Sequence, residues 1–209
     1  MSKISHYTYE EFDDPYKHFI ITPNNDIYQY VNDVWDKEFI IDKSISSEFF
    51  NRDIIKNNKI LSFLQTIIND FSEKIEIDTL PLSSAEYKQN IDISSRYTIN
   101  RGTHLDNQKK ELVGLWYFKD PDDTGGMDLY VCKDEYGNEK KFLPYSSNKM
   151  ILFKNHKNAW HGVTHRKKTN FPRKSIYFFT ERKSLGGLTP AQLAYLRSRV
   201  HKSHNFNIT

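Results

Sequence analysis

The sequence lacks the features that mark secreted and membrane proteins. Among its 209 residues only Cys132 is a cysteine, so no internal disulfide can form, which fits a reducing compartment. No apolar run approaches about 18 residues, so no membrane span is expected. The first residues, MSKISHYTYEEFDD, contain no apolar stretch of the secretory type. We therefore expect a cytoplasmic protein that does not associate with a membrane. Cys132 is expected to be a buried apolar residue that fills space in the core.

Internal repeats, low-complexity tracts and clear linkers are also missing from the sequence. Together with a length that suits one full core, this predicts a single domain over residues 1–209. Within it, we expect residues 1–90 to be mainly helical support and residues 91–181 to form the core that carries the active site. Residues 182–209 are expected to form a helical tail.

Charge is distributed unevenly along the chain. Residues 1–100 hold 10 Lys and Arg against 17 Asp and Glu, whereas residues 101–209 hold 20 against 10. From Lys140 onward there are 15 basic residues and a single acidic one, Glu181. This excess either marks an anionic ligand or reflects a composition rich in solvated lysines. Basic residues interleaved with aromatics, as in RNA or DNA binding, are not found, so no nucleic-acid partner is expected.

Two helices are predicted in the N-terminal part. One begins at the cap formed by Asn24–Asp26, and the other runs over Asn58–Phe71. Both show the i, i+3, i+4 spacing of a helix with one apolar face. The apolar residues are Ile27, Tyr30, Val31 and Val34 in the first, and Ile60, Phe63, Leu64, Ile67, Ile68 and Phe71 in the second. A third helix is predicted over Ala191–Val200, because Thr189-Pro190 offers a cap and a proline at the first helical position.

From Ile91 the sequence changes to short runs rich in β-branched and aromatic residues. Turn residues separate the runs, and this alternation is typical of strands. The predicted strands are Ile91–Ile99, Leu112–Phe118, Met127–Cys132, Met150–Lys154, Ala159–His165 and Ser175–Thr180. Short strands at regular spacing favour a sandwich or a barrel, including the double jelly roll. The predicted fold class is therefore mostly β, with a strand core that N-terminal helices buttress.

The second half of the chain holds a pattern of four parts that carries chemistry. The parts are His104-Leu105-Asp106, Gly125-Gly126, Trp160-His161-Gly162-Val163 and Arg173-Lys174-Ser175. Residues two apart on a strand face the same way, so His104 and Asp106 can aim an imidazole and a carboxylate at one point. A second histidine would complete the set that binds Fe(II) and leaves coordination positions open. The fourth part offers a cation and a hydroxyl for an acid ligand.

This order and spacing resembles the Fe(II)/2-oxoglutarate-dependent dioxygenases, in particular their prolyl-4-hydroxylase-like branch, over roughly Ser95 to Glu181. The resemblance implies a double-stranded β-helix (jelly roll) core. It implies Fe(II) as the metal, 2-oxoglutarate as the co-substrate and ascorbate as a reductant. The residues that it assigns to the metal are His104, Asp106 and His161. Those that it assigns to 2-oxoglutarate are Arg173, Ser175 and Tyr117.

The distal metal ligand has three candidates in the sequence, His156, His161 and His165. His161 and His165 would share a strand face, so strand parity cannot separate them. His156 lies in a stretch typical of a turn, whereas Trp160–Val163 matches the H-G-V pattern of related oxygenases and favours His161. Tyr97 is either a pocket residue or a core tyrosine. The stretch from Tyr97 to His104 is shorter than is usual in the family, so the roof of the pocket and the substrate are not predicted.

The resemblance implies hydroxylation of an unactivated C–H bond, with succinate and CO₂ as co-products. The expected substrate is a small molecule or a peptide side chain, and it is anionic if the basic residues border the pocket. A nucleobase demethylase is disfavoured because Phe179, not an arginine, stands six residues after Arg173. A halogenase is disfavoured because Asp106 fills the carboxylate position. The alternative is a non-catalytic jelly-roll module that binds a metal or a ligand.

Overall fold

A computed structural model describes residues 6–39, 50–78, 80–90, 102–126, 128–164, 166–167 and 169–182. Over these ranges the chain forms ten strands and two helices. The large sheet contains β1 (Tyr7–Phe12), β2 (His18–Pro23), β3 (Phe50–Ile54), β4 (Leu82–Asn90), β5 (Lys110–Phe118), β8 (Lys149–Lys154) and β10 (Arg173–Glu181). The small sheet contains β6 (Leu129–Cys132), β7 (Lys141–Leu143) and β9 (Trp160–Val163). The helices are α1 (Asn25–Glu38) and α2 (Asn58–Ser72).

The strand order places the C-terminal strand β10 inside the large sheet. That sheet runs β1-β2-β8-β5-β10-β4-β3, and the small sheet runs β7-β6-β9. Every pairing between these strands is antiparallel. The protein is thus mostly β, with two antiparallel sheets and two helices in the described part of the chain.

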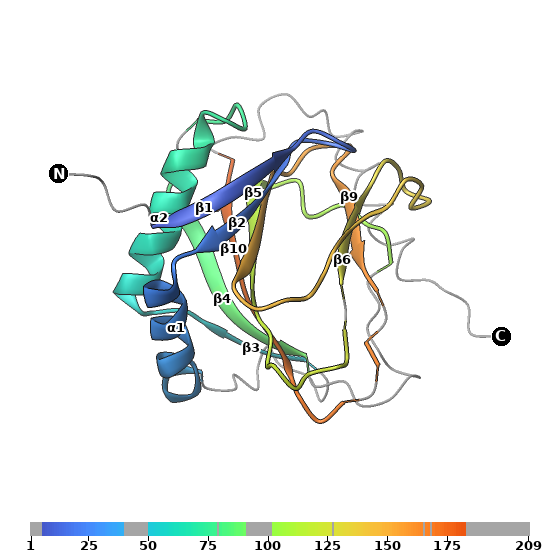
Figure 1. Ribbon diagram of the computed structural model, residues 1–209. Coiled ribbons are helices and arrows are strands. Elements are labelled where there is room, and N and C mark those ends of the chain that lie inside the picture. The colour runs from blue at the N-terminus through green and yellow to red at the C-terminus, as the bar shows by residue number, and fades with distance from the viewer. Residues whose placement is uncertain are drawn as a thin grey trace.

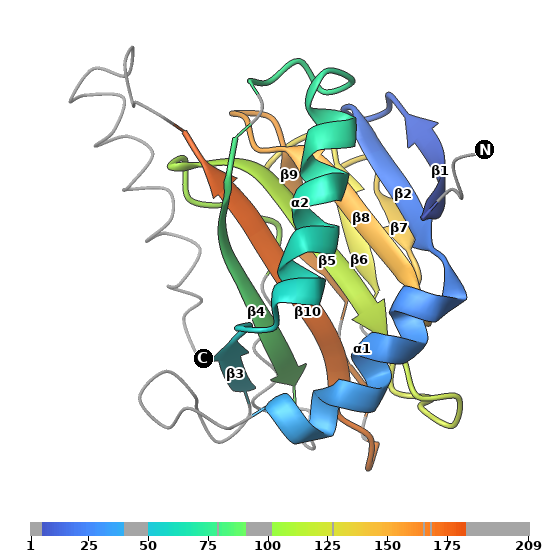
Figure 2. The ribbon, with the colours of Figure 1, turned by 90° about the vertical axis from the view of Figure 1, so that its left-hand side faces the viewer.

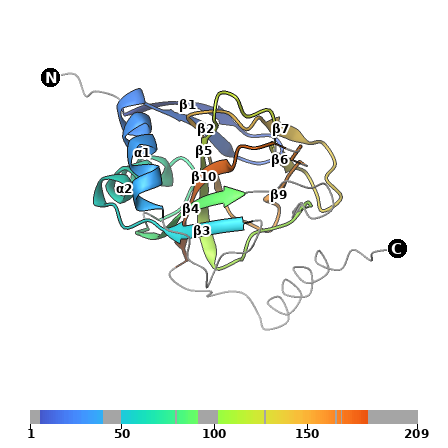
Figure 3. The same cartoon turned by 90° about the horizontal axis from the view of Figure 1, so that it is seen from below.

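The helices and sheets are arranged in three layers. Both helices cover one face of the large sheet, and the small sheet lies over the other face (Figure 1, Figure 2). The view from below shows the same order, with the large sheet in the middle (Figure 3). One apolar core fills the helix side and includes Trp35, Leu64 and Phe178. A second core joins the two sheets and includes Tyr117, Val131 and Phe153.

Both helices start at an asparagine cap. The side-chain oxygen of Asn24 accepts the Ile27 N–H at 3.1 Å, and that of Asn57 accepts the Ile60 N–H at 3.1 Å. Each helix then buries one apolar stripe against the large sheet, which holds it in place. Neither of these two helices combines the length and the apolar character that crossing a bilayer requires.

The N-terminal segment differs from the sequence prediction. The pattern of residues 1–90 predicts mainly helical support, but this segment also supplies β1, β2, β3 and β4 of the large sheet. β1 is largely exposed, and β4, with the sequence LSSAEYKQN, has few apolar residues, so neither shows a clear strand pattern. Pairing with neighbouring strands creates them, since strand formation depends on tertiary context. The β core is therefore not confined to residues 91–181.

The predicted strands that fall on described residues are present with shifted ends, as β5, β6, β8, β9 and β10. β7 is an additional strand that the sequence did not indicate. The predicted strand Ile91–Ile99 and the predicted helix Ala191–Val200 lie outside the described residues, as does the tail after Arg182.

Candidate functional site

Three candidate metal ligands, His104, Asp106 and His161, come together where β9 faces the large sheet. Their potential ligand atoms all lie within 4.8 Å of one another. The two histidines are joined by a backbone bridge, in which the His104 N–H donates to the His161 carbonyl at 2.8 Å and the His161 N–H donates back at 3.1 Å. This pairing sets the two imidazole rings side by side, with centroids 4.5 Å apart.

Backbone contacts also fix the hydrogen positions on both imidazoles. Nδ1 of His104 lies 2.9 Å from the Gly102 carbonyl oxygen, and Nδ1 of His161 lies 2.9 Å from the Ala159 carbonyl oxygen. A carbonyl oxygen only accepts, so each Nδ1 must carry the hydrogen and donate it. When such a ring is neutral, its lone pair is on Nε2, which is then the nitrogen able to bind a metal. Such a contact on the far ring nitrogen is typical of metal-binding histidines.

Asp106 is only 8% exposed, and its charge state follows from opposing effects. Burial raises the pKa of its carboxyl, but the electrostatic effects of His161, Lys110 and His104 lower it. With a hydrogen bond from Tyr177 added, the pKa of Asp106 falls to about 2. The side chain is therefore a carboxylate at neutral pH. Two imidazoles and one carboxylate are the donor set of non-haem Fe(II) sites, so the residues present fit that metal.

Gly162 has a packing role beside His161. β9 pairs with β6 so that Gly162 lies opposite Tyr130 and His161 opposite Val131. A Cβ added to Gly162 would lie 2.4 Å from the Tyr130 hydroxyl oxygen, closer than real contacts allow. A side chain at position 162 would collide with Tyr130, so the glycine after His161 allows β9 to pair with β6 at this point.

The residues predicted to bind an acid form one buried group on β10 and β5. Arg173 is 5% exposed, and its Nη2 donates to the Tyr117 hydroxyl at 2.9 Å. Ser175 is 1% exposed, lies two residues further on the same face, and is the register partner of Tyr117. Burial raises the pKa of the Tyr117 hydroxyl, and the Arg173 charge partly opposes this. Tyr117 therefore remains a neutral hydrogen-bonding group beside a cation.

Two arginines are buried near Tyr145, and their surroundings differ. Arg166 forms a 2.7 Å ion pair with Asp123, and both side chains are fully buried. Arg173 has no carboxylate partner among the residues that the structure describes, although Nε lacks a hydrogen bond there in both arginines. An unpaired buried charge costs several kcal/mol. Arg173 is therefore the arginine that an acid ligand would complete.

The acid-binding group and the metal cluster are connected along one face of β10. Arg173, Ser175 and Tyr177 are spaced two residues apart and therefore share that face. The Tyr177 hydroxyl donates to Oδ2 of Asp106 at 3.0 Å. Strands rise about 3.3 Å per residue, so Arg173 and Tyr177 lie roughly 13 Å apart along the strand. The face thus presents a buried cation, a hydroxyl and then the tyrosine that contacts Asp106 of the cluster.

Several site residues were not found from the sequence. Strand parity with Arg173 and Ser175 could have indicated Tyr177. Lys110, whose Nζ lies 3.7 Å from Oδ1 of Asp106, had no such signal. Nor did the fully buried Asn155, whose amide donates to the backbone carbonyls of Asn107 and Lys110 at 2.9 and 3.1 Å and so holds the turn after Asp106.

The other candidates from the sequence have different outcomes. His156 is not part of the cluster and packs against Tyr16, with ring centroids 5.6 Å apart. His165 and Tyr97 lie outside the described residues. Gly126 has a positive φ, at 70°. A Cβ on the preceding glycine, Gly125, would lie 2.8 Å from Cζ of Arg166, so Gly125 makes room for the buried ion pair.

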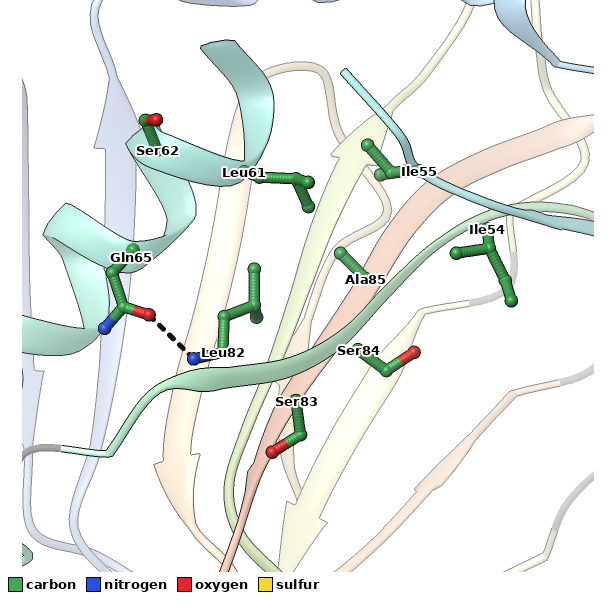
Figure 4. Close-up of a pocket in the computed structure, with 9 residues that line it drawn as sticks. All are labelled: Ile54, Ile55, Leu61, Ser62, Gln65, Leu82, Ser83, Ser84 and Ala85. Atoms are coloured by element: carbon green, nitrogen blue, oxygen red, sulfur yellow. Dashed lines mark hydrogen bonds between the residues drawn. The ribbon is translucent and has the colours of Figure 1, made fainter. Parts of the chain in front are cut away.

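A separate hollow of about 480 Å³ lies between α2 and strands β3 and β4 (Figure 4). Nine uncharged residues line it: Ile54, Ile55, Leu61, Ser62, Gln65, Leu82, Ser83, Ser84 and Ala85. It offers no imidazole, thiol or carboxylate, and it shares no residue with the metal cluster. The hollow is therefore not a candidate for the chemistry described above.

Comparison with known proteins gives similarity in structure but not in sequence. No family model matches the sequence, and no curated protein matches it. A prolyl-4-hydroxylase of Pseudomonas putida is similar with a TM-score of 0.54 and 10% identity, over 85% of this chain and 93% of that one. A Shewanella oneidensis protein assigned as an oxygenase is similar with a TM-score of 0.53 and 12% identity, over 88% and 90% of the two chains.

A prolyl hydroxylase of Trichoplax adhaerens, in complex with a peptide fragment of the hypoxia-inducible factor oxygen degradation domain, is similar with a TM-score of 0.50 and 13% identity. The match covers 78% of this chain and 83% of that one. At such identities these similarities show a common fold. The prolyl-4-hydroxylase-like resemblance drawn from the sequence is thus confirmed for the fold.

Proposed function

We propose that this protein is an Fe(II)- and 2-oxoglutarate-dependent dioxygenase that hydroxylates an unactivated C–H bond, with succinate and CO₂ as co-products. The observation that carries the proposal is a His-Asp-His cluster whose aspartate accepts a hydrogen bond from Tyr177, on the same face of β10 as a buried arginine that has no carboxylate partner among the described residues. The cluster would bind a metal with open coordination positions. An acid that chelates this metal could at the same time place a second carboxylate on the arginine. The hydroxylases and the oxygenase with the same fold support this reading.

The proposal includes a specific architecture. We assign the two antiparallel sheets to a double-stranded β-helix (jelly roll), because they enclose the cluster from opposite sides. The chain is proposed to be one domain, since β1 to β4 and the later strands share one sheet.

Each site residue has a proposed role. His104, Asp106 and His161 hold Fe(II) through Nε2, a carboxylate oxygen and Nε2. Arg173 binds the distal carboxylate of 2-oxoglutarate with paired, charge-assisted hydrogen bonds, and the hydroxyls of Tyr117 and Ser175 add to them. When bound, the metal and the co-substrate supply the oxidising chemistry.

The protein's own contribution is orientation and the exclusion of water. Phe153 packs against the His161 ring with centroids 5.1 Å apart, and Val131 and Ile151 belong to the same apolar core. Dry surroundings strengthen the attraction between Arg173 and a carboxylate, because the local dielectric constant is lower than that of water.

The substrate is proposed to be a small molecule or a peptide side chain. The Trichoplax neighbour, which binds a peptide, supports the peptide option. The basic residues offer less support for an anionic substrate, because described lysines lie on separate elements with partners of their own. Lys141 pairs with Asp14 and Lys174 with Asp36, each at 3.1 Å. The salt dependence of substrate affinity, with 2-oxoglutarate saturating, separates a charged from a neutral substrate.

Succinate formation tests the proposal. Protein loaded with Fe(II) is supplied with 2-oxoglutarate, ascorbate, O₂ and a cell extract as the source of substrate. We expect iron-dependent succinate, a product that gains one oxygen, and loss of both in His161→Ala. A protein that binds the metal but neither binds nor consumes 2-oxoglutarate would instead be the non-catalytic jelly-roll module.

A further inference from the structure

The Tyr177 hydroxyl lies between an ammonium group and a candidate metal ligand. Lys110 Nζ donates a short hydrogen bond to the Tyr177 oxygen, and Tyr177 is 3.0 Å from Oδ2 of Asp106. An ammonium group has only hydrogens to offer, so the Tyr177 oxygen accepts from Lys110. The phenol hydrogen is then directed to Asp106. Lys110 thus sets the direction of the bond that Tyr177 makes.

The two carboxylate oxygens of Asp106 are consequently not equivalent. Oδ2 accepts the hydrogen bond from Tyr177. Oδ1 faces the Lys110 ammonium at 3.7 Å, which is too long for a hydrogen bond. Among the described residues, Oδ1 therefore keeps its lone pairs for a metal, whereas one lone pair of Oδ2 is engaged by Tyr177 before any metal binds.

The backbone that carries Asp106 is held by other residues. Asn155 donates to the carbonyls of Asn107 and Lys110 at 2.9 and 3.1 Å, and the Arg182 N–H donates to the Lys109 carbonyl at 2.9 Å. These bonds fix the turn without Tyr177. Removing the Tyr177 hydroxyl would therefore free the rotation of the carboxylate while leaving the turn in place.

From this arrangement we infer that Tyr177, directed by Lys110, is a positioning residue that makes Asp106 offer one oxygen to the metal instead of two. The inference rests on the proposed function and deepens it. A carboxylate that binds through both oxygens takes an additional coordination position. The co-substrate chelates the same metal, so a single-oxygen Asp106 keeps the positions that it needs open.

The variant Tyr177→Phe tests this inference with cobalt(II) in place of iron. Cobalt affinity is measured by titration against a competing chelator, and 2-oxoglutarate affinity for the cobalt-loaded protein is measured by calorimetry. Loss of an outer partner of a metal ligand typically weakens metal binding by about 10–100-fold. We expect a cobalt affinity at least about tenfold weaker, and a weaker 2-oxoglutarate affinity as the carboxylate turns both oxygens toward the metal.

Tyr87→Phe is the matched control. The Tyr87 hydroxyl also donates to a carboxylate, Oε2 of Glu38 at 3.1 Å, but from the helix-facing side of β4. Both variants lose one phenol–carboxylate bond in the same sheet. We expect Tyr87→Phe to leave cobalt and 2-oxoglutarate affinities unchanged, which separates positioning of Asp106 from a general loss of stability.

The possible results separate the inference from the proposed function. Unchanged cobalt and 2-oxoglutarate affinities in Tyr177→Phe would overturn the inference and leave the proposed function standing. Failure of the unmodified protein to bind cobalt would overturn both. If Tyr177→Phe does not fold, a crystal structure of the cobalt-loaded unmodified protein decides. Asp106 bound through Oδ1, with Oδ2 on Tyr177, supports the inference, and both oxygens on the metal refute it.

Discussion

Among single residues, the contrast between Arg166 and Arg173 carries the firmest expectation. Both are buried, but only Arg166 has a carboxylate partner in the described structure, Asp123. Arg173→Ala should weaken 2-oxoglutarate binding by about 2–5 kcal/mol, roughly 30-fold or more, because a buried carboxylate loses its charged partner. Arg173→Lys should also bind poorly, since a point charge cannot replace the planar fork. Calorimetry on the cobalt-loaded protein measures both.

Lys174→Ala is the control for this pair of variants. Lys174 is the next residue on β10, but its Nζ lies 3.1 Å from Asp36 of α1, on the other face of the strand. Its removal should leave 2-oxoglutarate affinity unchanged. If Arg173→Ala also left it unchanged, the acid would bind elsewhere.

A second expectation concerns the metal itself. Fe(II), or cobalt in its place, should lie within about 2.0–2.3 Å of ligand atoms from His104, Asp106 and His161. His161→Ala should abolish tight metal binding in a chelator titration, whereas His156→Ala should retain it. A metal-loaded structure with His156 or His165 as a ligand would show the assignment to be wrong.

At this scale the sequence could indicate residues whose relation is local. His104 and Asp106 lie two apart, as do Arg173 and Ser175, so parity alone groups each pair. Lys110, Asn155 and Arg166 act through contacts with distant segments, and no spacing in the sequence reveals such partners. That is why the direct donors were proposed from the sequence and the residues that hold them were not.

Among the connecting segments, the buried Arg166–Asp123 pair joins the loop after β5 to the loop before β10. Breaking a buried ion pair by removing one partner typically costs about 3–5 kcal/mol, because the other charge is left unpaired. Arg166→Met should therefore lower the thermal midpoint of unfolding by several degrees, as measured by circular dichroism. Lys133→Met, which removes an exposed ion pair with Glu139, should not shift it. Equal midpoints for the two variants would contradict this.

Prediction of whole elements succeeded where the pattern is intrinsic to the segment. α2 has a continuous apolar stripe and an asparagine cap, so its place could be read from the residues. β5 and β8 are apolar on both faces because each is central and covered on both sides. β1, β3 and β4 lie at the margins of the sheet and read as polar or ambiguous. Their identity depends on the strand beside them.

At the scale of the whole molecule, the acidic first half and the basic second half contribute strands to one sheet. Asp14 meets Lys141, and Asp36 meets Lys174. β2 pairs with β8, and β4 pairs with β10. At these two contacts an acidic residue of the first half lies beside a basic residue of the second, which the sequence alone could not show because it gives charge without position.

This arrangement predicts one cooperative unfolding unit. Phe19 of β2 is fully buried and packs on Phe71 with ring centroids 4.8 Å apart. Phe19→Ala should cost about 3–5 kcal/mol. It should lower the unfolding midpoint equally by far-UV circular dichroism and by tryptophan fluorescence, which reports from Trp35, Trp116 and Trp160 in three different elements. Two separate transitions would contradict the single domain.

The two faces of β10 have a consequence for how this protein can change over time. Arg173, Ser175 and Tyr177 face the proposed site, whereas Ile176 and Phe178 fill the core under the helices. Inserting or deleting one residue within the strand would exchange the faces beyond that point. Apolar rings would then enter the pocket, and polar groups would enter the core. β10 can therefore accept single substitutions but not an insertion or a deletion. Adaptation to a new substrate must then come from changes in the segments around β10.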